Sequence, residues 1–281
     1  MLQEPSLRRT GIVAAAAVVL AALPALAQAP LPEATPVALP PVAPVAPSPK
    51  CAVSPEFARF DLPLSRVALR LSGGLPIKIV AIGSSSTAGA GASSPAADYP
   101  SRLEVELNRH FPGHDLTVIN RGVNGEEAPD MLARFETGVI AENPHLVIWQ
   151  VGTNALLRDR PIDPRAVVLH EGLARLRAIR TDVVLMDPQY APKVIAKSDR
   201  DAVVDQIAAI AKDEKVDLLR RYAIMRGWHD ADGMSFDSFV TSDGLHMNDW
   251  GYACLAKWLG VAIAEASTRP TETASVPQSK R

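Results

Sequence analysis

Short apolar runs alternate with amphipathic stretches along most of this 281-residue chain. The apolar runs are nearly continuous, which predicts β-strands at residues 77–82, 116–119, 146–151, 183–186 and, more weakly, 216–219. Between and after them, apolar residues recur three and four positions apart, which predicts helices at residues 99–111, 129–140, 164–179, 200–211 and 248–266. A regular succession of strand and helix is typical of an α/β fold.

Strands that are apolar on both faces are typical of a parallel sheet with helices on either side. The expected fold is therefore a three-layer α/β/α sandwich around a doubly wound, parallel five-stranded sheet with the flavodoxin-like strand order 2-1-3-4-5. In such sheets, ligands bind at the carboxyl ends of the strands, near the point where the strand order reverses. The loops after the first three strands contain the polar sequences GSSST, NRGVNGEE and GTNALL, so chemistry is expected there.

The N-terminal end has the layout of a cleavable export signal. Arg8 and Arg9 precede an apolar run that ends near Leu23, and the small residues at 25–27 follow, which predicts a signal peptide over residues 1–27. The apolar run is shorter than the ~20 residues that a bilayer requires, so no stable membrane span is expected after cleavage. General secretory and twin-arginine export both stay open. Either one predicts a periplasmic or secreted protein.

The rest of the chain divides into a linker, a domain and a tail. Residues 28–51 are rich in proline and alanine, and residues 30–49 alone contain eight prolines, which favours extended polyproline backbone. The folded domain is expected at residues 52–268, followed by a polar tail at 269–281. Without the signal, the chain has 27 Lys and Arg against 30 Asp and Glu, a net charge of −3, so no nucleic-acid partner is expected.

The two cysteines and two of the histidines raise the question of metal binding. Cys51 and Cys254 could form one disulfide in an exported protein, and two unpaired thiols are the alternative. Their spacing is not that of a metal site. His110 and His114 flank a Pro-Gly turn and are interpreted as surface residues, whereas Trp149 on the third strand is interpreted as part of the core. No metal ion or organic cofactor is expected.

The polar loops contain the groups that nucleophilic serine catalysis requires. A serine hydroxyl needs a base to take its proton, an acid to hold that base, and donors for the oxyanion. Asp243 and His246 are three residues apart, so one turn of helix-like backbone would place both on one side. Gly125 could supply a backbone N–H, and Asn154 a carboxamide. Glycine and asparagine are also common in ordinary turns.

Four separated blocks resemble the conserved blocks of the SGNH or GDSL esterases and lipases. In chain order they are GSSST at residues 83–87, NRGVNG at 120–125, GTN at 152–154 and DGLH at 243–246. One position departs from the family pattern, because Ser84 stands where that family usually has aspartate.

The resemblance implies a role for each matching residue. Ser85 would be the nucleophile, His246 the general base and then acid, and Asp243 the residue that orients the imidazole. The oxyanion would be bound by Ser85 N–H, Gly125 N–H and the Asn154 side chain. The register that places Gly83 two residues before the nucleophile favours Ser85 over the serines on either side of it.

Two other interpretations of the serine loop fit the residues less well. A phosphate-binding loop would need a lysine, and none lies between Lys78 and Lys193. An α/β-hydrolase elbow would need a glycine where this chain has Thr87.

The loop after the fourth strand also lies on the predicted active edge. Asp187, Gln189 and Tyr190 are expected to shape a substrate pocket there, with a plain proline-braced turn as the alternative.

The expected function is an exported serine esterase that removes short acyl groups, above all acetyl, from envelope or extracellular carbohydrate. The expected partner is therefore a small ester or an acylated carbohydrate. Because the same groups could pass an acyl group to a sugar hydroxyl, a carbohydrate O-acetyltransferase stays open. A non-catalytic carbohydrate-binding protein with this fold is a further alternative.

Overall fold

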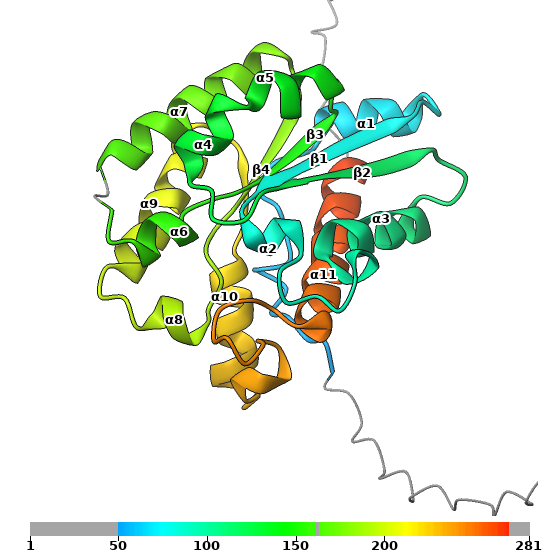
Figure 1. Cartoon of the computed structure of the whole chain (residues 1–281). Coiled ribbons are helices and arrows are strands. Elements are labelled where there is room, and N and C mark those ends of the chain that lie inside the picture. The colour runs from blue at the N-terminus through cyan, green and yellow to red at the C-terminus, as the bar shows by residue number, and fades with distance from the viewer. Residues whose placement is uncertain (1–49, 161–162, 270–281) are drawn as a thin grey trace, which may run out of the picture. The chain divides into compact units, whose positions relative to one another are not determined.

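The computed structural model describes residues 50–160 and 163–269 (Figure 1). The predicted signal peptide lies outside the described residues, as do residues 28–49 of the predicted linker and residues 270–281 of the predicted tail. In the part of the chain that is described, no helix combines the length and the apolar character needed to cross a bilayer.

Within the described residues, five parallel strands form one sheet in the order β2-β1-β3-β4-β5, which confirms the predicted topology. The strands are β1 (Ile77–Gly83), β2 (Leu116–Gly122), β3 (Leu146–Gln150), β4 (Asp182–Met186) and β5 (Asp217–Leu219). β1 pairs with β2 over its whole length and with β3 on its other side. The loops after β1, β2 and β3 therefore leave the sheet at the same edge.

Helices cover both faces of the sheet, which confirms the three-layer arrangement (Figure 1). On one face lie α1 (Ser65–Ser72), α3 (Tyr99–His110) and α11 (Asp249–Thr268); on the other lie α4 (Ala128–Ala133), α5 (Phe135–Gly138), α7 (Asp163–Ala178) and α9 (Arg200–Asp213). Shorter helices follow the strands near the predicted active edge, namely α2 (Ser85–Ala88), α6 (Thr153–Leu157), α8 (Pro192–Ile195) and α10 (Arg221–Arg226). Single turns of 3₁₀-helix occur at Pro95–Ala97, Ile140–Glu142 and Phe236–Ser238, and a π-helical turn at Gly227–Ala231.

The helix predicted at residues 129–140 is broken in the structure. α4 ends before Arg134, whose backbone leaves helical geometry at φ −110° and ψ 13°. The Arg134 guanidinium is held by both carboxylate oxygens of Glu126 and by the Arg121 carbonyl. These tertiary hydrogen bonds divide a segment whose apolar spacing alone is that of one helix.

The start of the domain is fastened to distant parts of the chain. Cys51 and Cys254 form a disulfide, so of the two alternatives left open by the sequence the structure contains the bridge. The bridge joins the first described residues to α11, where Cys254 is buried. Close by, the Trp228 indole N–H donates to the Ala52 carbonyl over 2.9 Å.

Two aspartates, each the first residue of a strand, bind the N-terminal segment through its backbone N–H groups: Asp182 begins β4 and Asp217 begins the edge strand β5. The Asp182 carboxylate accepts hydrogen bonds from the N–H groups of Arg66 and Val67 and so caps α1, a helix that the sequence pattern did not predict. In the same way, Asp217 Oδ1 accepts from the N–H groups of Asp61 and Leu62, each over 3.0 Å. Both contacts join residues more than a hundred positions apart in the sequence.

The free energy of unfolding is expected to respond to the ionisation of Asp217. Burial raises the pKa of this carboxyl group to about 6, although the N–H groups of Leu62 and Asp61 oppose the rise. Between roughly pH 4 and pH 6 the folded protein therefore binds more protons than the unfolded chain, so this group's contribution to stability is lost as the pH rises.

The Asp217→Asn variant keeps the Oδ1 atom that accepts both hydrogen bonds and cannot ionise. Compared with the wild type, its free energy of unfolding is expected to gain about 2–3 kcal/mol on going from pH 4 to pH 7.5. Urea unfolding of both proteins across this range measures the difference. Parallel curves for the two proteins would show that Asp217 keeps an ordinary pKa.

Candidate active site

Ser85 lies where the chain turns from β1 into α2 at the carboxyl edge of the sheet. It is the first residue of α2, and among the described residues its N–H has no hydrogen-bond acceptor, as expected for the first turn of a helix. Ser84 and Ser86 on either side are each only 2% exposed, whereas Ser85 is partly exposed. Of the three consecutive serines, Ser85 alone therefore combines access from solvent with a free N–H.

A histidine and an aspartate from the long loop before α11 reach this serine. His246 Nε2 lies 2.8 Å from Ser85 Oγ, and His246 Nδ1 lies 2.5 Å from Asp243 Oδ2. With Nδ1–H donating to the carboxylate, Nε2 presents a lone pair to the serine hydroxyl. The arrangement allows His246 to take a proton from Ser85 while Asp243 stabilises the imidazolium.

The turn that presents this pair differs from the helix-like turn predicted from the sequence. Asp243 Oδ1 accepts hydrogen bonds from the N–H groups of Leu245 and His246 and from the Thr241 hydroxyl, which closes an Asx-type turn. Helical geometry begins only at α11, which Asn248 caps by accepting from Gly251 N–H. Local side-chain bonding to the backbone therefore replaces helical bonding at this position.

The same hydrogen bonds keep Asp243 charged. Burial acts to raise the pKa of its carboxyl group, but the bonds from the His246 side chain, the His246 backbone, Thr241 and Leu245 outweigh it and hold the pKa well below its ordinary value. Asp243 is thus a carboxylate throughout the neutral pH range, as a residue that orients a histidine must be.

Gly125 on the loop after β2 and Asn154 on α6 after β3 come from neighbouring loops. Gly125 has a φ of +81°, a conformation that favours glycine, and its N–H has no acceptor among the described residues. The Asn154 amide donates one hydrogen bond of 2.8 Å to the Glu126 carbonyl, which ties the two loops together. The second amide hydrogen stays available, since a carboxamide nitrogen has two.

Ser84, which departs from the aspartate of the resembling family, anchors α2 to the sheet. Its N–H and its hydroxyl both donate to Gln150 Oε1, over 2.8 and 3.0 Å, and the Thr87 hydroxyl donates to the same oxygen. Gln150 is the last residue of β3, is buried, and was not singled out from the sequence. The only signal for it was a polar residue at the end of an apolar strand.

Two of the residues expected to line a substrate pocket are internal instead. Asp187 and Gln189 are each 1% exposed, so neither side chain offers a surface to a substrate. Gln189 accepts a hydrogen bond from the Thr153 hydroxyl and donates to the Leu245 carbonyl. It therefore links the residue before Asn154 to the residue before His246, a positioning role.

Asp187 belongs to the buried structure behind this loop. Its carboxylate accepts from the N–H of Tyr222, and its carbonyl accepts from the Arg221 guanidinium. Burial raises the pKa of the Asp187 carboxyl group to about 7, against the opposing influence of Tyr222 N–H and Arg221. Tyr190, the third residue of the predicted pocket, is partly exposed.

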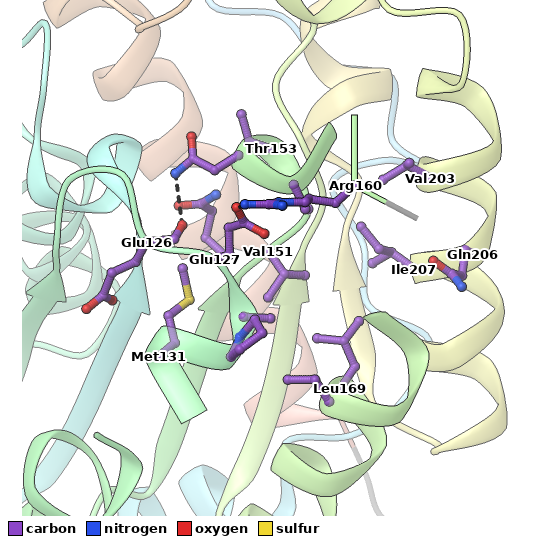
Figure 2. A pocket seen from close by; sticks show the side chains of 17 residues that line it. Glu126, Glu127, Met131, Val151, Thr153, Arg160, Leu169, Val203, Gln206 and Ile207 are labelled. Carbon is purple, nitrogen blue, oxygen red and sulfur yellow. Dashed lines mark hydrogen bonds and ion pairs between the residues drawn. The ribbon is translucent and has the colours of Figure 1, made fainter. Parts of the chain in front are cut away.

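Beside Asn154 lies an apolar cavity of about 210 Å³ (Figure 2). Its wall includes the side chains of Met131, Val151, Leu169, Val203 and Ile207. Asn154 and Glu126, which are joined by the hydrogen bond from the Asn154 amide to the Glu126 carbonyl, both line the cavity. Ser85, Asp243 and His246 do not line it, so it adjoins the serine site without containing it.

The remaining predictions about individual side chains concern the core and the surface. Trp149 is fully buried against Phe135, with their ring centroids 4.9 Å apart, which confirms its interpretation as a core residue. His110 is exposed and His114 partly exposed. Among the described residues, no group of three or more His, Cys, Asp or Glu is placed to hold a metal ion.

Two relatives align with part of the chain. An acetylxylan esterase from Geobacillus stearothermophilus is 32% identical over 94 residues, which cover 30% of this chain and 43% of the relative. An arylesterase from Vibrio mimicus is 28% identical over 123 residues, which cover 43% of this chain and 59% of the relative. The chain thus spans less than two thirds of the length of each of these two relatives.

Solved structures with low sequence identity share the fold. A two-domain esterase, CEX, described as active on acetylated mannans, has a TM-score of 0.68 at 20% identity, covering 82% of this chain and 61% of its own. TesA has a TM-score of 0.57 at 22% identity, covering 67% of this chain and 99% of its own. The relation predicted from the four sequence blocks is confirmed at the level of the family: residues 50–269 match the Non-GDSL lipase-like family, and the chain belongs to it.

Proposed function

We propose that this protein is an exported serine esterase that hydrolyses short-chain acyl esters, above all acetyl esters, of carbohydrates. The observation that carries the proposal is the hydrogen-bonded series from Ser85 Oγ through the His246 imidazole to the Asp243 carboxylate. The names of the similar proteins support the substrate class, because acetylxylan and acetylated mannans are both acetylated polysaccharides.

In the first half-reaction, His246 Nε2 accepts the hydroxyl proton while Ser85 Oγ bonds to the ester carbonyl carbon. The charged Asp243 stabilises the imidazolium that forms. The carbonyl oxygen becomes an oxyanion and accepts hydrogen bonds from Ser85 N–H, Gly125 N–H and the Asn154 amide. As the carbonyl re-forms, the bond to the sugar oxygen breaks, and His246 gives its proton to that oxygen. The products are a free sugar hydroxyl and an acyl-serine.

The second half-reaction repeats these steps with water as the nucleophile. His246 takes a proton from the water, whose oxygen bonds to the acyl carbon, and the same donors hold the oxyanion. The bond to Ser85 Oγ then breaks, the acid leaves, and His246 returns the proton to Ser85. These side chains and backbone groups thus provide the nucleophile, the general base and acid, and the oxyanion donors for every step of the cycle.

Export is part of the proposal. The Cys51–Cys254 disulfide supports it, because disulfides persist in oxidising compartments such as the periplasm and the extracellular space. The predicted signal over residues 1–27 would direct the chain there.

The Asn154→Ala variant is expected to lower kcat by ~10²–10³-fold with little change in KM, because an oxyanion donor acts mainly in the transition state. Steady-state kinetics on 4-nitrophenyl acetate measure both constants. Arg158→Met is the matched control, because it also removes a hydrogen bond to this loop, at the Gly125 carbonyl, but no proposed oxyanion donor. An unchanged kcat in Asn154→Ala would leave Asn154 with the single role of tying the two loops together.

Intact-mass spectrometry after treatment with a fluorophosphonate tests the proposal directly. We expect one adduct on the full chain, absent from Ser85→Ala and present in Ser94→Ala, an exposed serine on the loop after α2. Acetate release from acetylated xylan or mannan tests the substrate class. No adduct on the folded protein would favour a non-catalytic carbohydrate-binding role. Acylated sugar formed from an added glycan before free acid would identify an O-acetyltransferase.

A further inference from the structure

Another pocket, of about 310 Å³, lies beside the loop that follows β4. Its lining comes from that loop, from α8, from the start of α9 and from α10. The lining residues are Tyr190, Ile195, Arg200, Asp201, Tyr222 and Arg226. None of them belongs to the proposed catalytic machinery, and every one of the six except Ile195 has a side chain that can form hydrogen bonds.

One wall of this pocket is aromatic. The Tyr190 ring meets the Tyr222 ring edge to face, with centroids 5.2 Å apart, and it stacks on Phe236 at 5.8 Å. His229 continues the stack, 4.1 Å from Phe236. Tyr190, His229 and Phe236 are all partly exposed. An aromatic face carries partial negative charge and attracts the slightly positive C–H groups on the flat face of a sugar ring.

The charged side chains of the pocket are balanced. Arg226 pairs with Asp230 at 2.9 Å, and Arg200 lies 3.5 Å from the Asp201 carboxylate. Each guanidinium is therefore matched by a carboxylate, which leaves hydrogen-bond donors and acceptors side by side without an excess of either charge. Such a lining suits the hydroxyl groups of a neutral sugar, which both donate and accept, better than it suits an anion.

The pocket is connected to the serine site by the loop that bears Tyr190. On one side of Tyr190, the Gln189 amide donates to the Leu245 carbonyl; on the other, Lys193 N–H donates to the Gly244 carbonyl over 2.9 Å. Leu245 directly precedes His246. The residue that forms the aromatic wall is thus held against the turn that presents the catalytic histidine.

From the balanced charges, the aromatic wall and this connection, we propose that the pocket is a subsite for a neutral sugar unit of an acylated polysaccharide whose ester group is cleaved at Ser85. This inference rests on the proposed esterase function in one respect only, namely that the bound polymer is an acylated polysaccharide. Sugar binding at Tyr190 and its neighbours does not itself require a reactive serine.

The test uses the full chain and a double variant, Asp201→Ala with Arg226→Ala. Both side chains are mostly exposed, 65% and 61%, so their removal leaves the core intact. Calorimetric titration with deacetylated manno- and xylo-oligosaccharides is expected to show binding to the wild type and at least about tenfold weaker binding to the double variant. The matched control is the double variant Glu171→Ala with Arg175→Ala, which removes an exposed ion pair on α7. It is expected to leave oligosaccharide binding unchanged.

Kinetics provide a readout that separates this inference from the esterase proposal. In the double variant, the ratio of kcat/KM for an acetylated oligosaccharide to kcat/KM for 4-nitrophenyl acetate is expected to fall about tenfold or more. If the protein binds oligosaccharide through this pocket but hydrolyses no ester, the subsite stands and the esterase proposal fails. Hydrolysis without any oligosaccharide binding, or tighter binding of an oligouronate than of a neutral glycan, overturns the subsite.

Discussion

Replacement of Ser85 by alanine is expected to lower kcat for ester hydrolysis by at least ~10⁴-fold. The variant loses the atom to which the acyl group would bond, so no acyl-enzyme can form, and the oxyanion donors are left to act on a direct attack by water. Because Ser85 is partly exposed and its Oγ bonds only to His246 among the described residues, the fold should persist. Hydrolysis of 4-nitrophenyl acetate by wild type and variant, at matched thermal stability, measures the effect.

The neighbouring serines distinguish a loss of the nucleophile from a disturbance of the loop. Ser84→Ala removes a hydroxyl that bonds to Gln150 but no proposed reacting atom. It is expected to cost less than Ser85→Ala by two orders of magnitude or more, because Ser84 acts only by positioning α2. Wild-type activity in Ser85→Ala would exclude Ser85 as the nucleophile. An equal loss of activity in both variants would mean that the assay detects damage to the loop rather than the loss of one hydroxyl.

Loss of the Cys51–Cys254 disulfide is expected to lower the free energy of unfolding by about 3–5 kcal/mol. The bridge closes a loop between residues 203 positions apart, and a cross-link of that span restricts the unfolded chain strongly. In a domain of this size, such a loss corresponds to a fall of roughly 10 °C in Tm. Thermal unfolding with and without a reducing agent measures it.

Cys51→Ala is the appropriate variant, because Cys51 is only partly buried while Cys254 lies in the core of α11. It breaks the bridge and leaves the buried thiol in place, so little packing is lost. Its Tm is expected to match that of the reduced wild type and to be insensitive to the reducing agent. A Tm that reduction does not change in the wild type would show that the bridge contributes nothing to stability.

The sequence by itself determined the layers and the order of the elements. Strands β1, β3 and β4 are apolar on both faces, and such runs are typical of a parallel sheet that helices cover on either side. Through the resemblance of its four blocks to those of the SGNH or GDSL esterases, it also indicated Ser85, Gly125, Asn154, Asp243 and His246. Sheet geometry agreed with this, because the carboxyl ends of parallel strands gather their loops at one edge. Information of this kind is local, since it lies in the spacing of neighbouring residues.

The contacts that hold these loops together were decided only by the tertiary structure. Gln150 receives Ser84 from 66 positions away, Gln189 joins Thr153 to Leu245, and Asp182 caps α1 from a distant strand. The same is true of the break at Arg134. The position of a single glutamine or aspartate in the sequence does not reveal its hydrogen-bond partner. The partner is whichever donor or acceptor the folded backbone brings within reach. The burial of apolar side chains depends on the average pattern of a segment, which the sequence contains. Each polar contact depends instead on the distance and angle between two particular atoms, and these are set only when the chain has folded.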